Sequence, residues 1–258
     1  MGAPEQVTAR ATRLLAPNPG PMTLDGTNTW LLREPGVEGC VVVDPGPLDE
    51  AHLAQVADQG PVALIVLTHG HPDHSEGAVR LAELTDAPIT ARDPDLCVGA
   101  APLRADGVVD VASVEWLTVL TPGHSSDSVC FLLRADRALL TGDTVLGRGT
   151  TVVAHPDGRL ADYLDSLRRL RDLADVDVDV LLPGHGPVLD NPVAALDYYI
   201  SHRDERLEQV RAALAEGAID AKDVVRRVYA DVDPVLWSAA EKSVRAQLEY
   251  LRAASDST

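Results

Sequence analysis

The chain has 258 residues and carries 40 acidic against 22 basic side chains, which gives a formal net charge of −18. This length suits one large domain or one domain with a small appendage, and a hydrophobic fraction of 45 % is enough for a sizeable core. The excess of acidic groups makes the surface repel polyanions, so we expect no DNA partner, and no window approaches the roughly 18 uninterrupted apolar residues of a membrane span.

The amino terminus and the cysteines indicate a compartment. The first ten residues contain no apolar stretch of the kind found in secretory signals. Cys40, Cys97 and Cys130 lie far apart and form no Cys-x-x-Cys pair, so a disulfide framework is not expected. We therefore expect a cytoplasmic protein with free thiols.

Apolar runs of strand length recur through the first 185 residues and predict an α/β domain. Several are continuous in Val, Ile and Leu, which suits strands that are buried on both faces. The predicted strands, some with the turn that follows, are residues 26–32, 39–44, 62–67, 87–91, 114–120, 129–133, 138–143 and 178–185. Residues 75–84 carry apolar side chains at helical spacing, and Ser75 is placed to cap the start of that helix.

The segment from Thr68 to His74, Thr-His-Gly-His-Pro-Asp-His, places three imidazoles and a carboxylate directly after a predicted strand. A single loop histidine is usually only a solvated polar residue. Neutral imidazole and carboxylate are also the nitrogen and oxygen donors that zinc accepts, and such crowding brings no benefit to a merely solvated loop. His69, His71, Asp73 and His74 are therefore candidate metal ligands.

Three further predicted strands end in a turn that carries a histidine or an aspartate. His124 follows Thr-Pro-Gly, Asp143 follows Thr-Gly, and His185 follows Pro-Gly. A sheet would deliver ligands from distant chain positions to one edge in this way. The remaining histidines lack this setting and are predicted to be surface or helix residues; they are His52, His155 and His202.

Two polar residues near predicted strand ends have open roles. Asp44 either orients a metal-binding histidine or caps the turn after its strand. Asn28 either faces the site or serves the local structure.

Taken together, these motifs resemble the metallo-β-lactamase superfamily, a four-layer αββα sandwich. The resemblance implies His69, His71 and His124 on one metal, Asp73, His74 and His185 on a second metal, and Asp143 bridging the two. Segments 18–29, 142–150 and 199–203 further resemble the β-lactamase-like protein 2 group. The likeness runs nearly end to end.

The composition shifts after Asn191-Pro192. Helical stretches are predicted at 194–217, 221–228 and 236–253, and none carries a histidine turn of the kind described above. We expect a catalytic domain over residues 1–192 and a small helical accessory domain over 193–258, which the resemblance identifies as winged-helix-like. The alternative is that these helices merely cover the sandwich.

Two adjacent divalent metals lower the pKa of a water molecule and stabilise a developing oxyanion, which predicts a hydrolase that uses a metal-bridging hydroxide. Asp73 is expected both to bind the second metal and to orient that hydroxide. The donors include no thiolate, so zinc is favoured, with manganese or iron as alternatives.

Three classes of function remain open. The first is hydrolysis of a small ester, thioester or lactam, in line with a resemblance to glyoxalase II at the histidine loop, although Ser125 to Ser128 depart from that family's pattern. The second is cleavage of single-stranded RNA, as the β-lactamase-like protein 2 group implies, aided by Arg203, Arg206, Arg211, Arg226 and Arg227. The third is a non-catalytic binding module, which would require a lost ligand.

Overall fold

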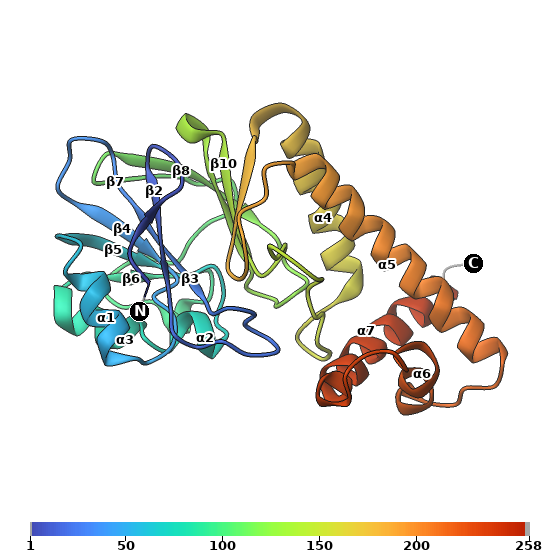
Figure 1. Cartoon of the computed structure of the whole chain (residues 1–258). Helices are drawn as coiled ribbons and strands as arrows, with labels where there is room; N and C mark the ends of the chain where they lie inside the picture. The colour runs from blue at the N-terminus through green and yellow to red at the C-terminus, as the bar shows by residue number, and fades with distance from the viewer. Residues whose placement is uncertain (1, 256–258) are drawn as a thin grey trace.

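Two β-sheets face each other in the computed structural model, which describes residues 2–255 (Figure 1). The first sheet has six strands in the order β1 (Glu5–Gln6), β2 (Ala11–Leu15), β3 (Asn28–Leu32), β4 (Cys40–Val43), β5 (Val62–Val66) and β6 (Ile89–Thr90). The second has five strands in the order β11 (Val180–Pro183), β10 (Ala138–Gly142), β9 (Val129–Leu133), β8 (Val114–Leu120) and β7 (Val108–Val111).

Helices lie against the outer face of each sheet. The first sheet carries α1 (Glu50–Ala57) and α3 (Ala78–Thr85), with the short α2 (Pro72–Ser75) at its edge, and the second carries α4 (Leu160–Asp177). Short 3₁₀ turns follow β6, β9 and α6: η1 (Pro94–Leu96), η2 (Arg134–Asp136) and η3 (Pro234–Leu236). The predicted αββα sandwich is confirmed.

Alternation along the strands explains the continuous apolar runs. In β4, Val41 and Val43 point into the core between the sheets, whereas Cys40 and Val42 pack under the helices of the first sheet. Trp30 and Trp116 are also buried between the sheets. Each strand thus needs apolar side chains on both faces.

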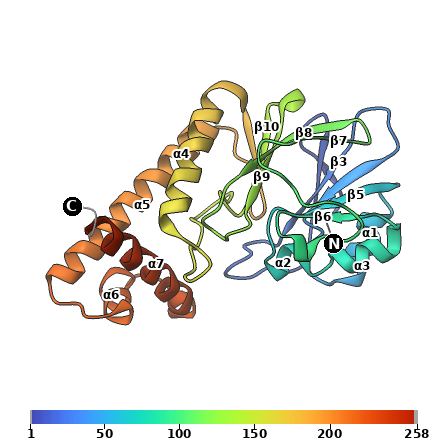
Figure 2. The same ribbon diagram turned by 180° about the vertical axis from the view of Figure 1, so that it is seen from behind.

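Three helices complete the chain: α5 (Pro192–Ala215), α6 (Ala221–Val228) and α7 (Trp237–Ser255). The first part of α5 packs on α4 through Leu196 and Tyr199, which belong to the core of the second sheet. Its last turns join α6 and α7 in a separate small core that contains Val210 and Val244. Figure 2 shows α6 and α7 projecting beyond the sandwich, with α5 as the connection.

The prediction of a single helix capped by Ser75 was wrong. Residues 75–84 form the end of α2 and the separate helix α3, and Gly77 rather than Ser75 precedes α3. The Ser75 hydroxyl instead donates to the carbonyls of Gly70 and His71, so it fastens the histidine loop. His52 does lie in a helix but is fully buried, where its Nε2 is 2.9 Å from the hydroxyl of Thr29.

Over residues 2–255, no helix is both long enough and apolar enough to cross a membrane.

Candidate metal centre

Parallel strand pairing brings the predicted ligand-bearing turns to one edge. In the first sheet β4 runs parallel to β5, and in the second β10 runs parallel to β11, so the carboxyl ends of each pair lie together. Backbone hydrogen bonds join the two sheets there: the N–H of Asn28 donates to the carbonyl of Gly184, and that of Val129 donates to the carbonyl of Thr68. The histidine loop, Asp143 and His185 therefore meet between the sheets.

Three imidazole nitrogens converge in the first group of donors. His69 Nε2 lies 3.0 Å and His124 Nε2 lies 2.9 Å from His71 Nδ1. At these distances the lone pairs of three unprotonated nitrogens would repel one another. A cation bound between them would remove that repulsion. The group is suited to holding a metal ion.

A second group of donors lies beside the first. His74 Nε2 is 3.1 Å from His185 Nε2, and Asp73 Oδ2 is 3.1 Å from the same His185 nitrogen. Both imidazoles are fully buried, whereas the Asp73 side chain is 30 % exposed. This second group combines nitrogen and oxygen donors and is also suited to a metal ion.

Asp143 stands between the two groups. Its Oδ1 lies 3.4 Å from His74 Nε2 and 3.5 Å from His185 Nε2, while its Oδ2 lies 3.8 Å from His124 Nε2. Oδ1 is buried and makes no hydrogen bond within the described residues. Burying a carboxylate oxygen without a hydrogen-bond donor costs free energy, and a bound cation would offset that cost. The residues present therefore fit a cation at this point.

The electrostatics of the two groups differ. Burial and the neighbouring imidazoles lower the pKa of His69 far below its ordinary value. Burial also works to lower the pKa of His185, but Asp143 and Asp73 outweigh it and raise that pKa to about 9. Burial alone would raise the pKa of Asp143, but His74 and His185 hold it well below its usual range. A metal that binds His185 would therefore compete with a proton for that nitrogen, whereas the lowered pKa of His69 favours its free, neutral form.

The second nitrogen of four of the five imidazoles has a fixed partner. His124 Nδ1 lies 2.8 Å from the carbonyl of Val152, and His185 Nδ1 lies 3.1 Å from that of Gly26. His69 Nδ1 lies 3.0 Å from the Thr68 hydroxyl, and His74 Nδ1 lies 2.9 Å from Asp44 Oδ2. Such contacts set the ring orientation, so the free nitrogens are aimed before any metal arrives.

Of the two roles considered for Asp44, the structure supports orientation of a histidine, because within the described residues its carboxylate contacts His74 and Thr68 and no group of its own turn. Its carboxylate accepts hydrogen bonds from the N–H and hydroxyl of Thr68, at 2.8 and 2.6 Å, while it orients His74. An Asp44→Asn variant keeps the size of the side chain but exchanges one acceptor oxygen for a donor. We expect zinc affinity to fall about 10- to 100-fold, measured by competition with a chromogenic chelator.

Asp86→Asn is the matched control for that experiment. Asp86 has nearly the same left-handed backbone conformation, with φ of 56° against 52° for Asp44, but it is exposed at the end of α3. Unchanged zinc affinity in Asp44→Asn, or an equal loss in Asp86→Asn, would contradict the role given to Asp44.

Two family models match this chain. Residues 22–185 match the family model described as the metallo-beta-lactamase superfamily, and residues 221–254 match that of the beta-lactamase associated winged helix domain. The chain belongs to the metallo-beta-lactamase superfamily. Helices α6 and α7 therefore form the matched winged-helix domain, although residues 192–255 contain no strand.

The superfamily members most similar in sequence include two curated relatives. The beta-lactamase-like protein 2 homolog of Caenorhabditis elegans is 35 % identical over 96 % of this chain and 85 % of the relative, and that of Drosophila melanogaster is 31 % identical over 95 % and 89 %. A solved beta-lactamase domain protein from Burkholderia ambifaria has a TM-score of 0.84 and 26 % identity over 98 % of this chain and 88 % of its own. The expected resemblance to the β-lactamase-like protein 2 group is confirmed.

Asn28, His155 and His202 belong to neither group of donors. The Asn28 amide donates to the carbonyls of Pro183 and Gly186, both at 2.9 Å, and so holds the turn that carries His185. His155 pairs with Glu249 of α7 at 3.3 Å. His202 lies in α5, half-buried, as the prediction of a helix residue allowed.

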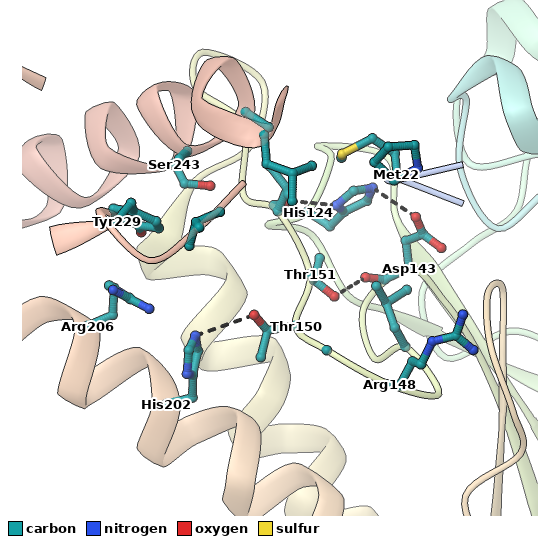
Figure 3. Close-up of a pocket in the computed structure, with 18 of the residues that line it drawn as sticks. Met22, His124, Asp143, Arg148, Thr150, Thr151, His202, Arg206, Tyr229 and Ser243 are labelled. Carbon is teal, nitrogen blue, oxygen red and sulfur yellow. Dashed lines mark hydrogen bonds and ion pairs between the residues drawn. The ribbon is translucent and has the colours of Figure 1, made fainter. Parts of the chain in front are cut away.

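A cavity of about 320 Å³ opens beside the metal centre (Figure 3). His124 and Asp143 form one side, and residues of α5 and α7, with the segment between α6 and α7, form the other. No pattern in the sequence predicts this cavity. Within it, Thr151 donates to the carbonyl of Asp143 at 2.7 Å, and nearby the hydroxyl of the buried Tyr199 accepts a hydrogen bond from the N–H of Leu146 at 2.8 Å.

Proposed function

We propose that this protein is a dinuclear-metal hydrolase that acts on a small ester, thioester or lactam. The observation that carries the proposal is the convergence of seven candidate metal donors, of which His124 and Asp143 also line a cavity of small-molecule size. Small-molecule sites are commonly clefts of about 300 to 1,000 Å³, and this cavity lies at the lower end of that range.

The proposed ligand sets are those that the resemblance implied. One metal would be held by His69, His71 and His124 and the second by Asp73, His74 and His185, and the Asp143 carboxylate would serve both. Imidazole and carboxylate donors without thiolate favour zinc, and manganese and iron accept the same donors.

Two bound divalent cations supply Lewis acidity and bring the pKa of a water molecule close to neutrality. The residues of the chain supply orientation and proton handling. Asp73 is the most exposed donor carboxylate, so it can reach an incoming water while its Oδ2 stays beside His185. Asp143 is held ionised by the neighbouring imidazoles and can balance positive charge throughout a cycle.

The arrangement of the arginines favours a small substrate over single-stranded RNA. Arg211, Arg226 and Arg227 are exposed on the accessory helices and pair with Glu208, Asp223 and Glu216, respectively. An extended phosphate backbone would have to compete with these carboxylates. Of the five arginines proposed for RNA contact, only Arg203 and Arg206 line the cavity.

A substrate panel tests the proposal. Metal-loaded protein is given a generic thioester, a chromogenic lactam and labelled single-stranded RNA, with a His69→Ala variant as the control for contaminating activity. We expect turnover of at least one acyl substrate, lost in the variant, and intact RNA. Cleavage of RNA that disappears in His69→Ala, without acyl turnover, would overturn the proposal in favour of a nuclease.

A further inference from the structure

The cavity beside the metal centre is positively charged although the protein is strongly acidic. Among its lining residues, three are arginines, and the only carboxylate is Asp143, which belongs to the metal centre. Arg148 is neutralised at the rim because it forms a two-bond ion pair with Asp25. Within residues 2–255, neither Arg203 nor Arg206 forms an ion pair with a carboxylate.

Arg203 is a buried cation whose partners within the described residues are neutral. It is only 4 % exposed, donates to the carbonyl of Thr151, and has its guanidinium carbon 5.2 Å from the centre of the Tyr163 ring. Its Nε is buried and has no hydrogen-bond partner within the described residues. Burying a guanidinium without a counter-charge is costly, so the fold maintains this charge at a stability cost.

Arg206 lies one turn further along α5. It donates to the carbonyl of Val228 at 3.0 Å, and its guanidinium carbon lies 4.4 Å from the centre of the Tyr229 ring. One bond uses only a fraction of the five N–H donors of a guanidinium. The stacking on Tyr229 fixes the plane of the group, which leaves its other N–H donors free for a ligand.

The two ends of the cavity are chemically different. Figure 3 shows Arg206 and His202 across the cavity from His124 and Asp143. Val232, Leu236 and Ala239 also line the cavity and contribute apolar surface. Burial, together with Arg203 and Arg206, lowers the pKa of His202 to about 4, so the arginines alone carry the positive charge at that end at neutral pH.

We propose that this cavity binds the unreactive part of an acyl substrate, and that this part ends in an oxyanion group, a carboxylate or a phosphate, that Arg206 binds and Arg203 supports. An apolar stretch between the scissile bond and the anion would lie against the wall formed by α7 and the segment before it. The inference rests on the proposed function only in placing the scissile bond of the substrate at the metal centre. The anion site itself rests only on the cavity and its two unpaired guanidiniums.

Binding measurements test the site without relying on turnover. Titration calorimetry on the metal-loaded full chain, at constant ionic strength, compares dicarboxylates from succinate to suberate with monocarboxylates of the same carbon number. Either ligand can place one carboxylate at the metals, so any preference reports the second anion. A parallel series of phosphonocarboxylates tells whether carboxylate or phosphate is favoured. We expect the doubly charged ligand to bind about tenfold or more tightly at one chain length, the ordinary size of a charge-assisted hydrogen bond.

Three variants separate the site from a general charge effect. Arg206→Met should reduce the preference to about one while monocarboxylate binding stays unchanged. Arg211→Met removes an exposed arginine of the same helix and should change neither. Ser243→Asp adds a carboxylate to the cavity wall and keeps Arg206, so it should also lower the preference. This variant replaces Arg206→Met as the test if Arg206→Met fails to fold.

The outcomes distinguish this inference from the proposed function. No preference at any length in the wild-type protein, or a preference that survives in both Arg206→Met and Ser243→Asp, overturns the anion site. A preference that is present in a protein without acyl turnover leaves the anion site standing and defeats the proposed hydrolase instead.

Discussion

An Asp143→Asn variant is expected to lose about a thousandfold or more in the rate of acyl hydrolysis and to bind fewer metal ions than the wild-type protein. The carboxylate places one oxygen near His74 and His185 and the other near His124, so it serves both groups of donors. An amide has one acceptor oxygen, and its NH₂ group would repel a cation. Losing several kcal/mol of charge stabilisation corresponds to about three powers of ten in rate.

The measurement pairs kcat/KM on the best acyl substrate with metal content by mass spectrometry. Asp157→Asn is the control, because Asp157 is an exposed aspartate that accepts a backbone hydrogen bond from Ser126 and belongs to neither group of donors. Full metal content together with unchanged kcat/KM in Asp143→Asn would remove Asp143 from the centre.

The apolar strands and their turns were readable from sequence because burial on both faces leaves a continuous signal. The stretch 62–67 contains no charged residue to interrupt the apolar run, and the structure has β5 there. Conversely, no element was predicted at 11–15, where β2 carries Thr12 and Arg13 at half-buried positions. A strand with mixed exposure shows neither clean alternation nor a pure apolar run.

The helix α4 was also not predicted, although its signal is present. Leu160, Leu164, Leu167 and Leu170 are buried at helical spacing, but Arg and Asp residues between them dilute the overall hydrophobicity. Ser75 illustrates the opposite error. A serine before an apolar periodic stretch is typical of a helix cap, but here the tight histidine loop captures its hydroxyl.

The convergence of seven donors could be anticipated because each one follows a strand, and parallel strands end at a common edge. The cavity could not be anticipated from the sequence. Its wall comes from Met22, the loop at 148–152, one turn of α5 and residues 229–243, and no local pattern specifies how the winged-helix domain packs on the sandwich. For the same reason the sequence offered Arg203 as an RNA contact, whereas packing buries it over Tyr163.

Replacing Asp73 by alanine is expected to abolish turnover. Two effects combine: the second group of donors loses its only carboxylate besides Asp143, and an incoming water loses the carboxylate that orients it and accepts its proton. Loss of a positioned acid or base alone typically costs about 10²- to 10⁴-fold. The side chain is 30 % exposed, so its removal should leave the fold intact.

Asp73→Asn at increasing zinc concentration separates these two effects. The amide retains an oxygen that can coordinate a metal but is a far weaker proton acceptor. If Asp73 only holds the metal, saturating zinc should restore the rate; if it also handles the proton, the rate should remain about a hundredfold or more below that of the wild type even with full metal content. Glu76→Gln, which changes an exposed carboxylate immediately after α2, controls for loss of negative charge near the loop. Undiminished turnover in Asp73→Ala would show that another group orients the water.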